Sequence, residues 1–190
     1  MKTMFKGLSA IVMLIALVSF TNAIEKKKIN VEDSKIEWIG EKLTGSHMGT
    51  INLKEGHFVM EGGELTGGEF IADMNTINVT DLSGDGKKKL EGHLNSDDFF
   101  GVNQYPTAKF VINNVAKKGK GSYGISGTMT IKGTSNPIAF DLKMDGEQAY
   151  TEIVIDRTKY DIKYGSGSFF DNLGDKTIYD EFTLKINLKY

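Results

Sequence analysis

The chain has 190 residues, with 23 basic against 25 acidic side chains, a formal net charge of -2 and no cysteine. This balance provides no basic excess that could attract nucleic acid or an anionic membrane surface. The absence of cysteine excludes disulfide bonds, thiol chemistry and cysteine zinc sites, so the fold has to depend on its own core.

The N-terminus has the three-part pattern of a secretory signal peptide. Lys2 and Lys6 precede an apolar run of 13 residues from Leu8 to Phe20, and a peptidase site is expected to end at Ala23. The run is short for a membrane span, although a retained N-terminal anchor is the alternative. We therefore predict a signal peptide over residues 1–23 and export to the periplasm or the cell exterior. One domain over 24–190 follows, with no membrane span after cleavage.

Polar and apolar residues alternate in most of the remaining chain. In each run the apolar residues share one face: Ile36 and Trp38; Phe70, Ala72 and Met74; Ala108, Phe110 and Ile112; Ile125, Met129 and Ile131; Ile138, Phe140, Leu142 and Met144; Ile153 and Ile155; Phe182, Leu184, Ile186 and Leu188. A period of two predicts antiparallel strands with one buried and one wet face.

Turn signals separate these runs at Glu61–Glu64, Lys117–Gly121, Gly133–Pro137 and Asp145–Gly146. We count about eight strands joined by short turns. The fold is therefore all-β, either a sandwich or an up-and-down barrel.

One segment departs from this alternation, between Gly86 and Phe100. Leu90 and Leu94 are four residues apart there, which places them on one stripe of a helix. We predict a short helix in this segment, lying over an end of the sheet.

Arg157 is the only arginine beside 22 lysines, which indicates a site that needs a forked, weakly hydrated donor. It shares a strand face with Ile153 and Ile155, and Asp180 has the inward phase of the last strand. The two charges are expected to pair, either as a structural ion pair or as a contact to a ligand head group.

His47 and Lys42 have the inward phase of their strands, provided that no bulge intervenes. Together they could meet a polar or anionic group, or His47 could be an ordinary interior histidine. The three histidines, His47, His57 and His93, have no metal-ligand spacing. We therefore expect neither a metal site nor a cofactor.

Motifs of catalysis are not evident in the sequence. It contains no Gly-x-Ser-x-Gly elbow, no phosphate-binding glycine loop and no His-Glu-x-x-His. A binding protein is therefore favoured over an enzyme.

Five segments resemble the YceI-like proteins, in the same order along nearly the whole mature chain. They are Trp38-x-x-x-Lys42-x-x-Gly45-x-His47-x-Gly49, His93-Leu94-x-Ser96-x-Asp98-Phe99-Phe100 with Tyr105-Pro106, Gly127-x-Met129-x-Ile131-Lys132-Gly133, Ile155-Asp156-Arg157-Thr158-x-Tyr160, and Asp180-Glu181-Phe182. The resemblance implies a lipocalin-like, eight-stranded antiparallel barrel with a lipid-sized cavity. It also implies polyisoprenoid or other long-chain amphiphilic ligands, and a homodimer.

We therefore expect a carrier that holds an isoprenoid-type lipid in its barrel. The tail is expected along Trp38, Phe70, Phe110, Met129, Phe140 and Phe182, with Phe99 and Phe100 near the mouth and the head at Lys42, His47 or Arg157, the last paired with Asp180. Two alternatives remain. One is a hydrolase or isomerase that acts on such a lipid through His47, and the other is an envelope protein with a packed interior.

Overall fold

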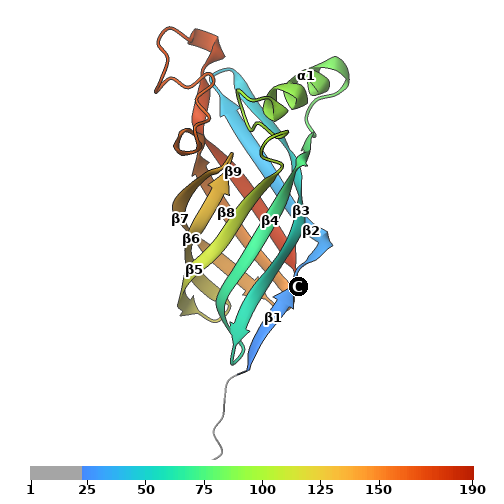
Figure 1. Ribbon diagram of the computed structural model, residues 1–190, viewed down its shortest axis with the longest axis vertical. Helices are drawn as coiled ribbons and strands as arrows, with labels where there is room; N and C mark the ends of the chain where they lie inside the picture. The colour runs from blue at the N-terminus through green and yellow to red at the C-terminus, as the bar shows by residue number, and fades with distance from the viewer. Residues whose placement is uncertain (1–22) are drawn as a thin grey trace, which may run out of the picture.

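The computed structural model describes residues 23–190; the signal peptide expected over residues 1–23 lies almost entirely outside this range. The described chain consists almost wholly of strands, with one α-helix and two short 3₁₀ turns, η1 and η2 (Figure 1). The elements are β1 (Ile24–Lys28), β2 (Asn30–Lys42), β3 (Gly45–Glu61), β4 (Glu64–Val79), α1 (Gly84–Asn95), β5 (Thr107–Gly119), β6 (Ser122–Ile131), β7 (Thr134–Asp145), β8 (Gln148–Asp156), η1 (Arg157–Tyr160), η2 (Gly174–Lys176) and β9 (Ile178–Lys189).

The strands form a closed antiparallel barrel. Strands β2 to β9 each pair with the next along the chain, and β9 returns to pair with β2. Strand β1 pairs with β3 farther along the same edge that β2 uses, so β1 and β2 are two pieces of one interrupted strand. The predicted eight-stranded up-and-down barrel is confirmed. Its longest strand, β3, has 17 residues and spans roughly 55 Å at the usual rise per residue.

The two ends of the barrel differ. At one end, the turn end, β3–β4, β5–β6 and β7–β8 are joined by two residues each. At the other, the helix end, long connections carry α1 between β4 and β5 and the segment 157–177 between β8 and β9 (Figure 1). The predicted helix is confirmed, and its Leu94 is buried in the core.

One turn lies earlier than the sequence indicates. Strand β7 begins at Thr134, so Pro137 stands inside a strand rather than in the turn predicted over Gly133–Pro137. A proline has no N–H to give to a neighbouring strand. Strand β7 pairs with β8 only through Lys143–Asp145, so the ladder loses nothing at Pro137 on that side.

Candidate ligand-binding cavity

The inward faces of the strands leave a cavity of about 110 Å³ inside the barrel, which we call the larger chamber. One water needs roughly 10–15 Å³ of such space, so the chamber has room for a slim chain and not for a bulky ligand. Of the residues expected to line a tail, Phe70, Phe110, Met129, Phe140 and Phe182 lie in its wall. Met74 lies there too, and methionine adapts readily to a flexible neighbour.

The larger chamber offers no free polar group. Only Lys109 and Thr151 among its 23 lining residues have polar side chains. The ammonium of Lys109 lies 2.9 Å from a carboxylate oxygen of Glu69. The hydroxyl of Thr151 donates to the carbonyl of Asp141 at 2.8 Å. Because both side chains are already satisfied, only an apolar molecule gains from entering.

A second cavity of about 70 Å³, the smaller chamber, lies at the helix end. Its wall includes Trp38, Phe99 and Arg157. Phe100 and Phe182 line both chambers, and their ring centroids are 6.5 Å apart. The two chambers therefore adjoin at these rings, and Ile51 lines both as well.

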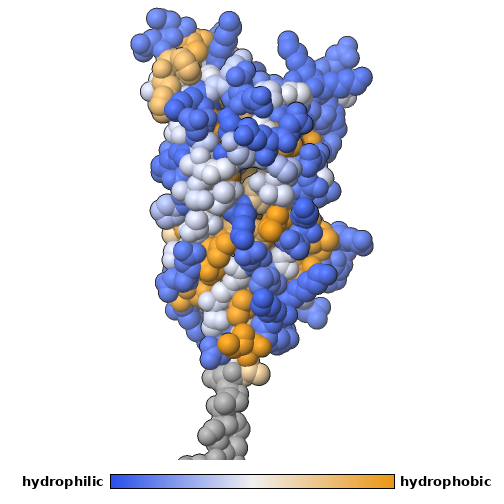
Figure 2. Space-filling model, viewed as in Figure 1, coloured by the Kyte–Doolittle hydropathy of each residue, from blue (hydrophilic) through white to orange (hydrophobic). Residues whose placement is uncertain are grey.

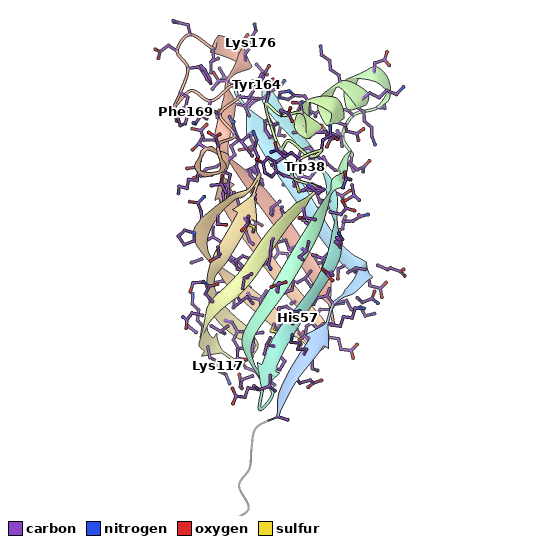
Figure 3. All side chains as sticks on the ribbon, in the orientation of Figure 1. Trp38, His57, Lys117, Tyr164, Phe169 and Lys176 are labelled. Carbon is purple, nitrogen blue, oxygen red and sulfur yellow. The ribbon has the colours of Figure 1, made fainter. Side chains whose placement is uncertain are left out.

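The indole of Trp38 packs against Gly49 of β3, in the upper part of the barrel (Figure 3). A Cβ at Gly49 would stand 2.0 Å from the carbonyl oxygen of Asn78 and 2.5 Å from the indole Cζ2. Glycine is therefore required at this position by close approach.

We expect Gly49→Ala to lower the free energy of unfolding by about 2–3 kcal/mol, because Trp38 and the β4 backbone both have to shift. Gly40→Ala is the matched control, since a Cβ at Gly40 meets nothing within 4 Å. Urea denaturation of both variants measures the difference. An equal effect at the two positions would contradict the packing described for Trp38.

Arg157 is 2% exposed, and its donors are directed to the protein itself. Nη1 donates to the carbonyl of Ile162 at 2.7 Å, Nη2 to that of Ile178 at 3.0 Å, and Nε to that of Tyr179 at 3.0 Å. The register between β2 and β9 shifts at this level, between Gly40 and Lys42. The guanidinium thus ties both stems of the β8–β9 connection together where the ladder is irregular.

The expected pairing of Arg157 with Asp180 is present, at 3.5 Å from Nη2 to Oδ1. Burial raises the pKa of Asp180, but hydrogen bonds from Ser166 and Ser168 and the charge of Arg157 outweigh it, so the pKa is lowered overall. Burial also lowers the pKa of Arg157, against the opposing charges of Asp180 and Asp156. This geometry matches the structural alternative more closely than a group free to bind a ligand. Asp180 lines neither chamber.

His47 and Lys42 also line neither chamber. His47 Nδ1 lies 2.8 Å from Asp81 Oδ2, at the rim of the helix end. Burial raises the pKa of Asp81, but the hydrogen bonds from His47 and from the Met48 amide lower it by more. Among residues 23–190, Asp81 is the side chain that is hydrogen bonded to His47.

One aromatic contact at the helix end could not be read from the sequence. His93 of α1 contacts Tyr164 of the β8–β9 connection, with ring centroids 4.3 Å apart and the planes tilted by 59°, and its centroid lies 5.4 Å from that of Phe99. Burial lowers the pKa of His93, against the charge of Asp98. The imidazole thus packs α1 against the β8–β9 connection.

A histidine with a lowered pKa binds fewer protons folded than unfolded, so its contribution to stability is complete above the unfolded pKa and is lost as the pH falls below it. We expect the urea concentration at the unfolding midpoint to decrease as the pH is lowered from 7.5 to 5.5. His93→Phe keeps an aromatic contact with Tyr164 and should reduce this decrease of the urea midpoint with pH. An identical pH dependence in the two proteins would show that His93 does not cause it.

Within residues 23–190, no group of three or more histidine, aspartate or glutamate side chains is arranged to hold a metal ion. The same residues include no helix that is both long and apolar enough to cross a membrane.

Sequence relatives are bacterial proteins of uniform description. A "UPF0312 protein" of Shewanella denitrificans is 31% identical over 100 residues, which are 53% of this chain and 50% of that protein. A "UPF0312 protein" of Pseudomonas putida strain W619 is 27% identical over 146 residues, 75% of this chain and 74% of its own. The match thus spans about half of the Shewanella relative and three quarters of the Pseudomonas one.

Solved structures share the fold. BcnA of Burkholderia cenocepacia superposes with a TM-score of 0.63 at 19% identity, over 84% of this chain and 98% of its own. A polyisoprenoid-binding domain from Saccharophagus degradans gives a TM-score of 0.60 at 13% identity, over 88% and 97%. The family model described as the YceI-like domain matches residues 28–190. The chain therefore belongs to the YceI-like family.

Proposed function

We propose that this protein is an exported carrier that holds a long-chain isoprenoid, or a similar amphiphilic lipid, in the barrel. The observation that carries the proposal is the larger chamber, an apolar cavity whose two polar side chains are already satisfied. The fold it shares with a domain described as polyisoprenoid-binding supports the same class of ligand. Burial of apolar surface, at about 25 cal/mol per Å², would drive uptake.

The direction of the ligand follows from where polar groups are found. The tail would occupy the larger chamber, between Phe70, Phe110 and Phe140, because no unpaired polar group opposes it there. The head would lie toward the smaller chamber, past Phe100 and Phe182. Of the residues expected at the head, Arg157 lines this chamber, with its donors bonded to backbone carbonyls, whereas Lys42 and His47 line neither chamber.

Export through the N-terminal 23 residues, a mature domain over 24–190 and a homodimer belong to the same proposal. N-terminal sequencing of the exported protein and sedimentation analysis would test them. The hydrolase alternative predicts that His47→Gln abolishes turnover of the lipid and spares binding. A completely packed interior, the other alternative, is disfavoured by the two chambers.

The only tryptophan, Trp38, lies in the wall of the smaller chamber and provides a signal for binding. We expect its fluorescence to change in a saturable manner on titration with polyprenols, with an affinity that increases with chain length. Short-chain geraniol should bind weakly, because it buries less apolar area. No saturable change with any chain length, together with no uptake by mass, would reject the proposal.

A further inference from the structure

Exposed apolar side chains are concentrated at the helix end of the barrel. Within residues 23–190, nine large hydrophobic side chains are exposed. Five of them lie in the connections at the helix end or within two residues of one: Leu43, Tyr164, Phe169, Phe170 and Tyr179. Figure 2 shows the apolar colour gathered on the loop that protrudes at the top left of the view, and Figure 3 labels Tyr164 and Phe169 there. Single exposed hydrophobics are ordinary, but a group at one end is not.

The loop 163–177, which we call the tip loop, is held in a defined conformation by hydrogen bonds. The amides of Phe169 and Phe170 both donate to the carbonyl of Ser166, at 3.2 and 3.0 Å. Ser166 itself is fully buried, and Asp180 accepts a hydrogen bond from the Ser168 hydroxyl. The two phenyl rings are therefore held outward by an anchored base, each about half exposed, at 50% and 51%.

The tip loop is also neutral in charge. It contains two lysines, Lys163 and Lys176, and two aspartates, Asp171 and Asp175. The ammonium of Lys163 lies 5.1 Å from the ring centroid of Phe169. An anionic or a cationic partner therefore has no excess of opposite charge to meet, and the apolar rings are the dominant feature.

The stems of the tip loop form part of the smaller chamber. Arg157 and Ile178, on either side of the loop, line that chamber, and Arg157 binds carbonyls of both stems. The exposed residues Glu41, Tyr179 and Glu181 line it as well, so the chamber approaches the surface beside the loop. The side of the smaller chamber that approaches the surface at Tyr179 thus lies beside the base of the tip loop.

We propose that the tip loop docks the protein on a phospholipid bilayer, with Phe169 and Phe170 inserted among the head groups and the smaller chamber turned toward the membrane. This inference depends on the proposed carrier function, which requires a route between a membrane and the cavity. Aromatic rings favour the membrane–water interface, where their apolar bodies leave water. The neutral loop predicts binding that does not depend on anionic lipid.

The exposed area favours a bilayer over a protein partner. Two half-exposed phenylalanines present roughly 100 Å² each, whereas a stable protein interface buries about 800 Å² on each side. A convex loop with a small apolar tip fits a soft interface that needs no complementary surface. A second copy of this chain is the competing occupant, and the experiment separates the two.

The test is flotation of the full-length exported protein with phosphatidylcholine vesicles. Phe169→Ser/Phe170→Ser should reduce the partition coefficient by more than about tenfold, because the inserted apolar area is lost. The matched control, Ile24→Ser/Tyr150→Ser, removes two exposed hydrophobics from the turn end and should leave binding unchanged. Both variants should unfold at the wild-type urea midpoint, since all four side chains are exposed.

Three results of the flotation assay would overturn the inference. They are no binding of wild type to phosphatidylcholine vesicles, equal binding of both double variants, and binding only to vesicles with phosphatidylglycerol that is lost in high salt. Conversion of a wild-type dimer to a monomer by Phe169→Ser/Phe170→Ser, without vesicle binding, would also overturn it and assign the tip to a second copy.

Cargo analysis of the same proteins separates this inference from the carrier function. If the Phe169→Ser/Phe170→Ser variant and wild type retain the same lipid but neither floats with vesicles, only the docking inference fails. If wild type floats through these rings yet never contains or takes up a lipid, the carrier function fails and the docking surface stands.

Discussion

Replacing Arg157 by methionine is expected to lower the free energy of unfolding by about 3–5 kcal/mol. The variant leaves the carbonyls of Ile162, Ile178 and Tyr179 without their donor and Asp180 without its counter-charge. Buried polar groups that lose their partners bear the whole cost of desolvation. Urea denaturation measures the loss.

Arg157→Lys should recover only part of this stability. An ammonium is a point charge on a flexible stem and cannot reach three carbonyls with the geometry of a planar fork. Lys159→Met is the matched control, because Lys159 is 65% exposed and lies 3.8 Å from its partner Asp156. It should change stability by less than about 0.5 kcal/mol.

The Arg157 series decides between the two roles that its sequence position leaves open. If Arg157 has a structural role, Arg157→Met should lose much of the free energy of unfolding, and the folded variant should still bind lipid. A head-group contact predicts the reverse, with near-normal stability and weakened binding. The second result would contradict the structural role assigned to Arg157.

Ala108→Phe is expected to weaken uptake of a long-chain isoprenoid by more than about 100-fold, provided that the tail occupies the larger chamber. Ala108 lines that chamber opposite Ala72, in direct register across β4 and β5. A phenyl ring placed there enters the larger chamber and removes apolar surface that drives binding. The fold should survive, because overpacking costs typically about 1–3 kcal/mol and here the ring enters existing space.

The same change on the outer face provides the control. Ala139 is exposed on β7, next to the chamber residue Phe140. Ala139→Phe should leave lipid uptake at the wild-type level. Titration of both variants with a long polyprenol, with urea midpoints as a check on folding, measures the difference. Equal uptake by Ala108→Phe and wild type would place the lipid elsewhere.

The strands could be predicted because their signal is local and repeated, whereas the choice of a barrel over a sandwich came only from the resemblance to YceI-like proteins. The run from Phe182 to Leu188 alternates apolar and polar residues without a break, and β9 has that pleat. Two-residue turns with glycine join the strands at the turn end, where the sequence places them. For the strands joined by such short turns the pairing order then follows, whereas β4–β5, β8–β9 and the closing pair β2–β9 are not fixed in this way.

The polar residues were harder to assign, because alternation along a strand shows on which side of the sheet a residue lies but not where it lies along the barrel axis. His47 has the phase of Gly49 and Ile51, but it lies at the rim and pairs with Asp81. The shift in register after Gly40 is a property of how β2 meets β9, which a single strand does not reveal. Nine of the twelve expected ligand residues line a chamber, and the three that do not are Lys42, His47 and Asp180.

Apart from Asp180, the partners of Arg157 could not be predicted from the sequence. Its three short hydrogen bonds are to backbone carbonyls on both sides of the 163–177 loop. Backbone acceptors have no sequence signature, so only the three-dimensional path of the chain brings them together. The contact of His93 with Tyr164 could not be predicted from the sequence either, because it joins α1 to a loop far along the chain.

Native mass spectrometry of the exported protein, purified without refolding, tests the carrier function most directly. The account predicts a fraction with added mass that corresponds to one long-chain isoprenoid or similar amphiphile. It also predicts that this mass is absent from Ala108→Phe and present in Ala139→Phe. Wild-type protein with no bound lipid, and with no uptake when polyprenols are added, would contradict the account.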